Sequence, residues 1–193
     1  MKRLLFLLLC AAVSSTAIKA QSFMHSAGGT VSVMIGQLDQ YFDENSVITR
    51  SDLTYFPRFN FVENENSSVS VGVPFGAGLS IVRDNYSGQS GLSWGLDFPL
   101  VLDYNIGAKS TPDHEGTFGG YFGAGYGLAL TSIKFEDDTK VKANSHGPLF
   151  RGGFRFGFPS SGTAIGMTVG AYFKMGLEKE KFKTFGFNIL VDF

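Results

Sequence analysis

Apolar residues recur at every second position over most of this chain, and this is the spacing of β-strands rather than of helices. In the clearest stretch, residues 69–81, all seven odd positions are apolar and the even positions are small or polar. Residues 92–106 repeat the pattern, and six further segments follow it: 30–38, 54–62, 118–130, 150–158, 165–175 and 184–193. No segment has the period of an amphipathic helix of useful length. The sequence therefore predicts an all-β protein with eight strands.

The second face of these strands indicates which side is buried. A soluble barrel or sandwich buries its bulky apolar residues, whereas a membrane barrel turns them toward lipid and fills its interior with small or polar residues. Here the second face is dominated by glycine, of which the chain has 25. Glycine packs poorly in a strand and costs entropy, but it suits a narrow closed interior. We therefore predict an eight-stranded antiparallel up-and-down transmembrane β-barrel.

Strand length agrees with a membrane span. Trp94 and Tyr104 lie ten steps apart, at ~3.3 Å a step along a strand. A tilt near 45° projects this to roughly 24 Å, which is close to the ~25 Å apolar band of outer-membrane barrels. We expect Trp94 and Tyr104 to mark the two membrane interfaces, with Leu100 between them near the bilayer midplane.

The first 20 residues have the pattern of a cleavable export signal. Lys2 and Arg3 precede an apolar run over residues 4–13, followed by small and polar residues. Ten apolar residues are about half of what a membrane-spanning helix needs. We expect cleavage after Ala20, or alternatively after Ala17, which leaves a barrel domain over residues 21–193. The single cysteine, Cys10, falls within the signal, so the mature chain has no disulfide.

The end of the chain resembles a known family. An alternating apolar strand ends in an aromatic residue, like the C-terminal signature of outer-membrane β-barrels: Phe185, Phe187, Ile189, Val191 and Phe193. The mature chain resembles the small eight-stranded OmpA/OmpX-like and PorT-like barrels. The resemblance implies an outer-membrane location and recognition of this last strand by the outer-membrane insertion machinery. Residues 107–115 are long for a periplasmic turn of this family, and residues 178–181 are short for an outer loop.

Two prolines interrupt otherwise regular strands. Pairing residues 69–81 with 92–106 about the loop at 83–89 places Pro74 opposite Pro99. Each proline lacks the backbone N–H that the ladder needs. We expect a bulge or irregularity at this point.

Charged residues on the inward face are expected to fill the barrel. An eight-stranded barrel has room for its own side chains or one small ligand. Unpaired buried charges are costly, so we expect these residues to pair with one another and form a closed interior; a gated or leaky pore is the alternative. The predicted interior charge network consists of Arg58, Asp97, Asp103, Arg151, Arg155, Lys174 and Asp192.

Catalytic and metal sites have weak signals. A lipid-modifying hydrolase or acyltransferase is conceivable from Ser145 and His146 with Asp137 and Asp138, but adjacent residues of a strand point to opposite faces. The consecutive residues 113–115, Asp-His-Glu, rarely converge on one ion. We therefore expect no catalytic residue, no metal and no cofactor.

The function predicted from sequence is a non-enzymatic outer-membrane barrel in contact with lipid. Its loops, residues 39–52, 83–89, 134–145 and 178–181, would serve envelope integrity, adhesion or partner binding, and the loop partner is unknown. Lys and Arg number 16 against 17 Asp and Glu, so no basic surface for nucleic acid is indicated. A lipid-modifying enzyme and a soluble lipocalin-like carrier are the alternatives.

Overall fold

The structure is a computed structural model that describes residues 21–36, 46–83, 90–135, 140–158, 165–177 and 182–193. Within these ranges the regular structure consists of eleven strand segments. None of the described residues belongs to a helix long and apolar enough to span a membrane. The segments are β1 (Ser22–Gly36), β2 (Ser46–Asn64), β3 (Ser67–Gly72), β4 (Phe75–Arg83), β5 (Ser90–Asp97), β6 (Leu100–Gly107), β7 (Phe118–Phe135), β8 (Lys140–Lys142), β9 (Ser145–Phe158), β10 (Ile165–Met175) and β11 (Lys183–Asp192).

The eleven segments form eight long antiparallel strands. β3 and β4 both pair with β2 in one continuous register, from Tyr55 opposite Phe75 to Arg58 opposite Gly72. β5 and β6 continue one another against β7, and β8 continues β9 against β7. The predicted eight-stranded antiparallel arrangement is therefore confirmed, with three of its strands interrupted.

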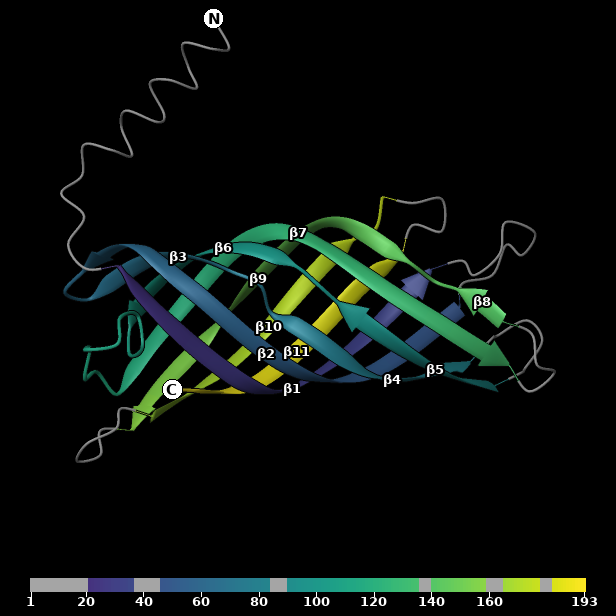
Figure 1. The fold of residues 1–193 in the computed structure, drawn as a ribbon, viewed down its shortest axis with the longest axis horizontal. Helices are drawn as coiled ribbons and strands as arrows, with labels where there is room; N and C mark the ends of the chain where they lie inside the picture. The colour runs from purple at the N-terminus through teal and green to yellow at the C-terminus, as the bar shows by residue number, and fades with distance from the viewer. Residues whose placement is uncertain (1–20, 37–45, 84–89, 136–139, 159–164, 178–181) are drawn as a thin grey trace, which may run out of the picture.

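The sheet closes on itself. β1 pairs with β2 on one side and with β11 on the other, so the first and last strands are joined and no long edge remains in the described barrel. β1 begins and β11 ends at the same end of the barrel, the terminal end (Figure 1). At the opposite end, the loop end, β1, β4 and β7 finish and β5 begins (Figure 1).

The two strand prolines lie where the sequence predicts an irregularity. Gly76 pairs with Asp97 and Gly72 with Val101, so the register predicted about the loop is kept on both sides of the gap. Ladder pairing stops between these two pairs, where Pro74 and Pro99 provide no N–H. The expected register and the expected interruption are both confirmed.

The orientation of the two faces is also as predicted. Large apolar side chains point away from the barrel and are exposed, among them Leu53 at 80% and Phe122 at 66%. Most inward positions hold serine, threonine, glycine or charged residues, many of them buried, and the inward apolar side chains gather in two buried clusters. A soluble carrier would have the opposite arrangement.

Several strands are longer than the alternation suggested. β1 begins at Ser22 rather than Thr30, and β2 begins at Ser46, within the segment predicted as the loop 39–52. β7 and β8 likewise occupy much of the predicted loop 134–145. These two loop assignments were wrong in extent, because the outward residues of these strand ends are polar, among them Thr49 and Lys134, and the apolar alternation stops before the strand does. The predicted signal, residues 1–20, and the loop 178–181 lie outside the described residues.

Candidate functional site

The barrel interior contains charged residues from several strands, and one group of them lies toward the loop end. Arg50 and Asp52 of β2 form an ion pair, with 2.8 Å between Arg50 Nε and Asp52 Oδ2. Asp97 of β5 lies between two cations, 3.6 Å from Arg50 Nη2 and 3.8 Å from Lys174 Nζ of β10. Four charges from three strands thus balance one another in the interior.

A second group lies toward the terminal end and is rich in arginine. Arg151 Nε is 3.7 Å from Asp103 Oδ1, and the Arg151 guanidinium lies over the rings of Phe56 and Tyr121 at 4.6 and 4.8 Å. Arg155 stacks on the same Tyr121 ring at 4.7 Å and donates from Nη1 to Asn105 Oδ1 over 2.7 Å. Aromatic faces therefore supplement the carboxylates as partners of these cations.

Asp192 ties together the strands that close the barrel. Its two carboxylate oxygens accept hydrogen bonds from Ser26 of β1 and from Thr168 of β10, the latter at 2.6 Å. Asp192 itself belongs to β11, which lies between those two strands. The carboxylate thus stabilises the joint between the first and last strands.

The loop between β6 and β7 closes the terminal end of the barrel. We call residues 108–117 the mouth loop; Ala108 and Ser110 in it are fully buried. Its backbone carbonyls receive interior donors: Lys109 O accepts from Arg58 Nη2 at 2.6 Å, and Ser110 O accepts from Asn60 Nδ2 at 3.0 Å. This loop is long for a turn because it folds back into the opening.

Backbone conformation and burial of the mouth loop agree with this inward course. Gly107 and Lys109 have φ values of 72° and 56°, and Lys109 is the one described non-glycine residue with positive φ. Burial lowers the pKa of Lys109 below its usual value, an effect that Asp192 opposes and Arg58 reinforces. Arg58 and Lys109 thus add positive charge at the same end of the interior.

An apolar layer closes the loop end. Six side chains, each at most 1% exposed, fill the interior beyond the ionic group: Met34, Ile48, Val82, Ile133, Ala143 and Phe182. They come from β1, β2, β4, β7 and the segments next to β8 and β11. The inward face therefore changes from polar to apolar along the same strands.

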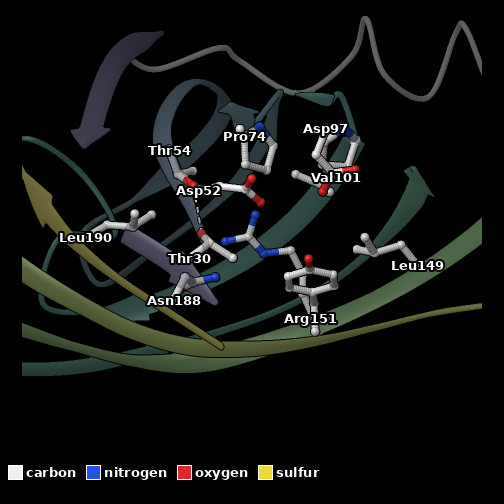
Figure 2. A pocket seen from close by; sticks show the side chains of 13 residues that line it. Thr30, Asp52, Thr54, Pro74, Asp97, Val101, Leu149, Arg151, Asn188 and Leu190 are labelled. Carbon is white, nitrogen blue, oxygen red and sulfur yellow. Dashed lines mark hydrogen bonds between the residues drawn. The ribbon is translucent and has the colours of Figure 1, made fainter. Parts of the chain in front are cut away.

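A small cavity remains between the two ionic groups. Its volume is about 30 Å³, and Figure 2 shows Asp52, Asp97 and Arg151 around it, with Thr30 and Thr54 joined by a 2.7 Å hydrogen bond. This is room for about two water molecules. Asp52 Oδ1 and Asn188 Oδ1 have no hydrogen-bond partner among the described residues, so a water molecule in the cavity would find polar partners.

The structure buries all seven residues of the predicted interior network. It brings Asp97 to Lys174 and Asp103 to Arg151. Arg50 and Asp52 also belong to the interior, although the sequence pattern predicted a loop for them. The inward residues of this segment do alternate, as Ile48, Arg50, Asp52 and Thr54. The alternation was hard to recognise because the outward residues between them, Thr49 and Ser51, are polar.

The predicted interfacial and C-terminal residues all lie on the outer surface. Trp94 on β5 and Tyr104 on β6 are 56% and 39% exposed. The C-terminal signature residues Phe185, Phe187, Ile189, Val191 and Phe193 alternate outward along β11 and the residue after it.

The residues considered for catalysis point apart. Ser145 is fully buried inside the barrel, whereas His146 lies on the outside, where its Nδ1 is hydrogen-bonded to the hydroxyl of Tyr126. Asp137 and Asp138 lie outside the described residues. Among the described side chains, no three His, Cys, Asp or Glu residues gather as metal ligands, and this includes Asp113, His114 and Glu115. Ser145 and His146 therefore do not form a Ser–His pair.

Inward glycines make room for aromatic rings. Gly186 of β11 is the cross-strand partner of Tyr172, and a Cβ added there would overlap the Tyr172 ring. We expect Gly186→Ala to lower the unfolding free energy by about 1–3 kcal/mol. Gly29→Ala is the matched control, because a Cβ there has no neighbour within 4 Å and should cost little. Urea unfolding in vesicles measures both; equal costs would contradict this packing role.

Solved structures share this fold. Neisserial surface protein A matches with a TM-score of 0.54 and 10% identity, covering 90% of this chain and 98% of that one. Ail, the attachment invasion locus protein of Yersinia pestis, matches at 0.53 and 12%, covering 91% and 97%. The outer membrane protein OprG from Pseudomonas aeruginosa matches at 0.51 and 14%, covering 91% and 95%. No family model and no curated protein sequence matches the chain. The chain has the fold of small outer-membrane β-barrels.

Proposed function

We propose that this chain is a non-enzymatic, integral outer-membrane β-barrel that carries surface loops on a closed, side-chain-filled support. The observation that carries the proposal is closure from both directions: the apolar layer fills the loop end, and the mouth loop fills the terminal end. Paired ions occupy the space between them. A barrel closed in this way has little room for passage, so its accessible surface is the belt in lipid and the loop end.

An outer-membrane location is supported by the exposed apolar side chains and by the shared fold. Exposing the outward-facing aromatic and aliphatic side chains to water would cost free energy, whereas the hydrocarbon core of a membrane accommodates them. The predicted export signal over residues 1–20 would bring the chain to this membrane. Recovery in the membrane fraction, with heat-modifiable gel migration after detergent extraction, is the expected result; a protein found soluble without detergent would contradict it.

Closure of the interior gives a direct electrical test. Pure refolded protein in a planar bilayer should show no stable single-channel openings, while a large porin in the same bilayer supplies the positive control. Heat-modifiable migration of the same sample verifies that the barrel is folded. Reproducible openings from folded protein would argue for the pore alternative.

Attachment is the loop function we place first. Ail, which has the same fold, is an attachment invasion locus protein. Deleting the gene and restoring it with loop-shortened forms should reduce adhesion of cells to a host or matrix surface while leaving barrel insertion intact. An envelope-integrity role would instead appear as detergent sensitivity.

The lipid-modifying alternative has a separate test. The mass profile of lipid A and phospholipids should be the same in cells with the wild-type chain and with His146→Ala. A product that disappears with this substitution would restore the enzyme hypothesis.

A further inference from the structure

The barrel wall lacks ladder hydrogen bonds where the β3–β4 strand passes the β5–β6 strand. Val73 N donates to a carbonyl of β2 at 3.2 Å, and Phe98 N donates to a carbonyl of β7 at 2.8 Å. Because successive N–H groups of a strand point to opposite neighbours, the donors between these two strands belong to the next residues, 74 and 99. Both are prolines and have no N–H. Two ladder hydrogen bonds are therefore missing at a single pair.

This interruption is long for a sheet. Paired residues resume at Gly72 opposite Val101 on one side and at Gly76 opposite Asp97 on the other. Four residue steps separate these pairs, which is about 13 Å of strand. We call this interval the wall gap.

The interior cavity adjoins the wall gap. Pro74 and Pro99 both line the cavity of about 30 Å³, as do Gly76 and Asp97 at the end of the gap. Figure 2 shows Pro74 and Asp97 at its edge. The mouth loop and the apolar layer close the two ends of the interior. The cavity therefore lies directly behind the part of this strand pair that no ladder hydrogen bond holds together.

Two aromatic rings cover the wall gap on the lipid side. Phe75 and Phe98 lie on the outward face, with ring centroids 5.0 Å apart and planes tilted by 53°. Phe98 lies between Trp94 and Tyr104 along the strand, and therefore within the apolar belt. Side chains change rotamer much more readily than a hydrogen-bonded ladder separates. The barrier between cavity and lipid is thus made by side chains that can move.

The polar atoms of the cavity suit a hydroxyl group. Asp52 Oδ1 and Asn188 Oδ1 are acceptors, and Arg151 Nη2 is a donor; none of these buried atoms has a hydrogen-bond partner among the described residues. A hydroxyl both donates and accepts, so it can satisfy atoms of both kinds. A charged head would disturb the balance of the neighbouring ions and lose its own solvation. The apolar part of the lining consists of Pro74, Pro99, Val101, Leu149 and Leu190.

We propose that the wall gap is a lateral port, through which the hydroxyl head of a single-chain alcohol dissolved in the membrane enters the cavity. Room for about two water molecules accommodates a hydroxymethyl group, so the alkyl chain stays in the gap between Phe75 and Phe98 and extends into the lipid. Because both ends of the interior are closed, the site binds this molecule and does not pass it across the membrane. This inference rests on the proposed membrane location.

The test uses the full mature chain in phosphatidylcholine nanodiscs, with methyl-labelled valine and leucine for NMR. 1-Dodecanol is titrated in, and dodecane and ethanol are titrated separately. We expect saturable shifts of the Val101, Leu149 and Leu190 methyls, with nuclear Overhauser contacts to them from the carbinol protons of dodecanol. Dodecane lacks the hydroxyl and ethanol lacks the chain, so both should have little effect. Absence of these contacts in the folded barrel would overturn the proposal, as would an equal response to dodecane or to ethanol.

Restoring the missing donors tests the port itself. Pro74→Ala with Pro99→Ala should weaken dodecanol binding at least tenfold, because two ladder hydrogen bonds then have to break before a chain can occupy the gap. The two amide protons that this variant gains should be protected from exchange. Pro148→Ala, at a proline of β9 away from the gap, should leave binding unchanged. Unprotected amides, undiminished binding, or an equal loss in Pro148→Ala would contradict the lateral port.

The head site has its own variants. Asn188→Leu removes an acceptor and fills the cavity, and we expect about tenfold weaker binding. Asn188→Ala keeps the space and should weaken binding several-fold, which makes the result independent of whether the leucine variant folds. Full binding by a folded Asn188→Leu variant would show that the head lies elsewhere. A wild-type chain that shows no heat-modifiable migration and does not enter nanodiscs would count against the proposed function instead.

Discussion

Arg50→Met is expected to lower the unfolding free energy of the barrel by about 3–5 kcal/mol, the usual cost of removing one partner from a buried ion pair. The Arg50 side chain is 1% exposed and that of Asp52 is 2% exposed, so water cannot easily replace the lost guanidinium. Asp97 keeps Lys174 after the substitution, but Asp52 loses its cation. Urea unfolding in lipid vesicles, followed by Trp94 fluorescence and gel migration, measures the loss.

A double variant isolates the cause of this loss. Arg50→Met combined with Asp52→Asn removes both charges of the pair and should recover most of the stability lost in the single variant, because no uncompensated carboxylate remains. If the single substitution costs less than about 1 kcal/mol, the ionic group does not stabilise the interior in the way described.

Leu100→Arg is expected to cost about 2–4 kcal/mol of folding free energy in membranes, the penalty for a cation facing lipid at the bilayer midplane. Leu100 is 56% exposed on the outer surface of β6, opposite Tyr126. It lies between Trp94 and Tyr104 along the β5–β6 strand. The measurement is the same unfolding experiment in vesicles.

Depth should decide the size of that effect. Thr49→Arg is the matched control: Thr49 also points outward and is exposed, but it lies near the loop end of β2, at the edge of the apolar belt. Its cost should fall to about 0–1 kcal/mol. A neutral Leu100→Arg would mean that the outward face does not contact hydrocarbon.

Local pattern was sufficient for much of the fold. Period-two alternation placed every long strand, and the pairing of residues 69–81 with 92–106 predicted Gly76 opposite Asp97. The prolines predicted the interruption because the missing N–H is a property of the residue itself. The glycine-rich second face predicted the inward side, since glycines leave room for the rings and long side chains that meet in a narrow interior.

Other features depended on contacts that no local pattern contains. Arg50 and Asp52 were missed because the alternation had been recognised by its apolar outer face, and Thr49 and Ser51 are polar there. β2 continues toward the loop end, where Ile48 points inward into the apolar layer while Thr49 and Ser51 point outward. The mouth loop was noticed only for its length. Its burial depends on donors from Arg58 and Asn60, which lie 51 and 50 residues away in sequence.

The apolar layer has a consequence for whatever the molecule meets outside the cell. Because the apolar layer packs the barrel at the loop end, the strand ends that carry the proposed surface loops are held in fixed positions. The spacing between the loop bases is therefore fixed before a partner binds. Binding to several loops would then cost less conformational entropy than binding to a flexible segment.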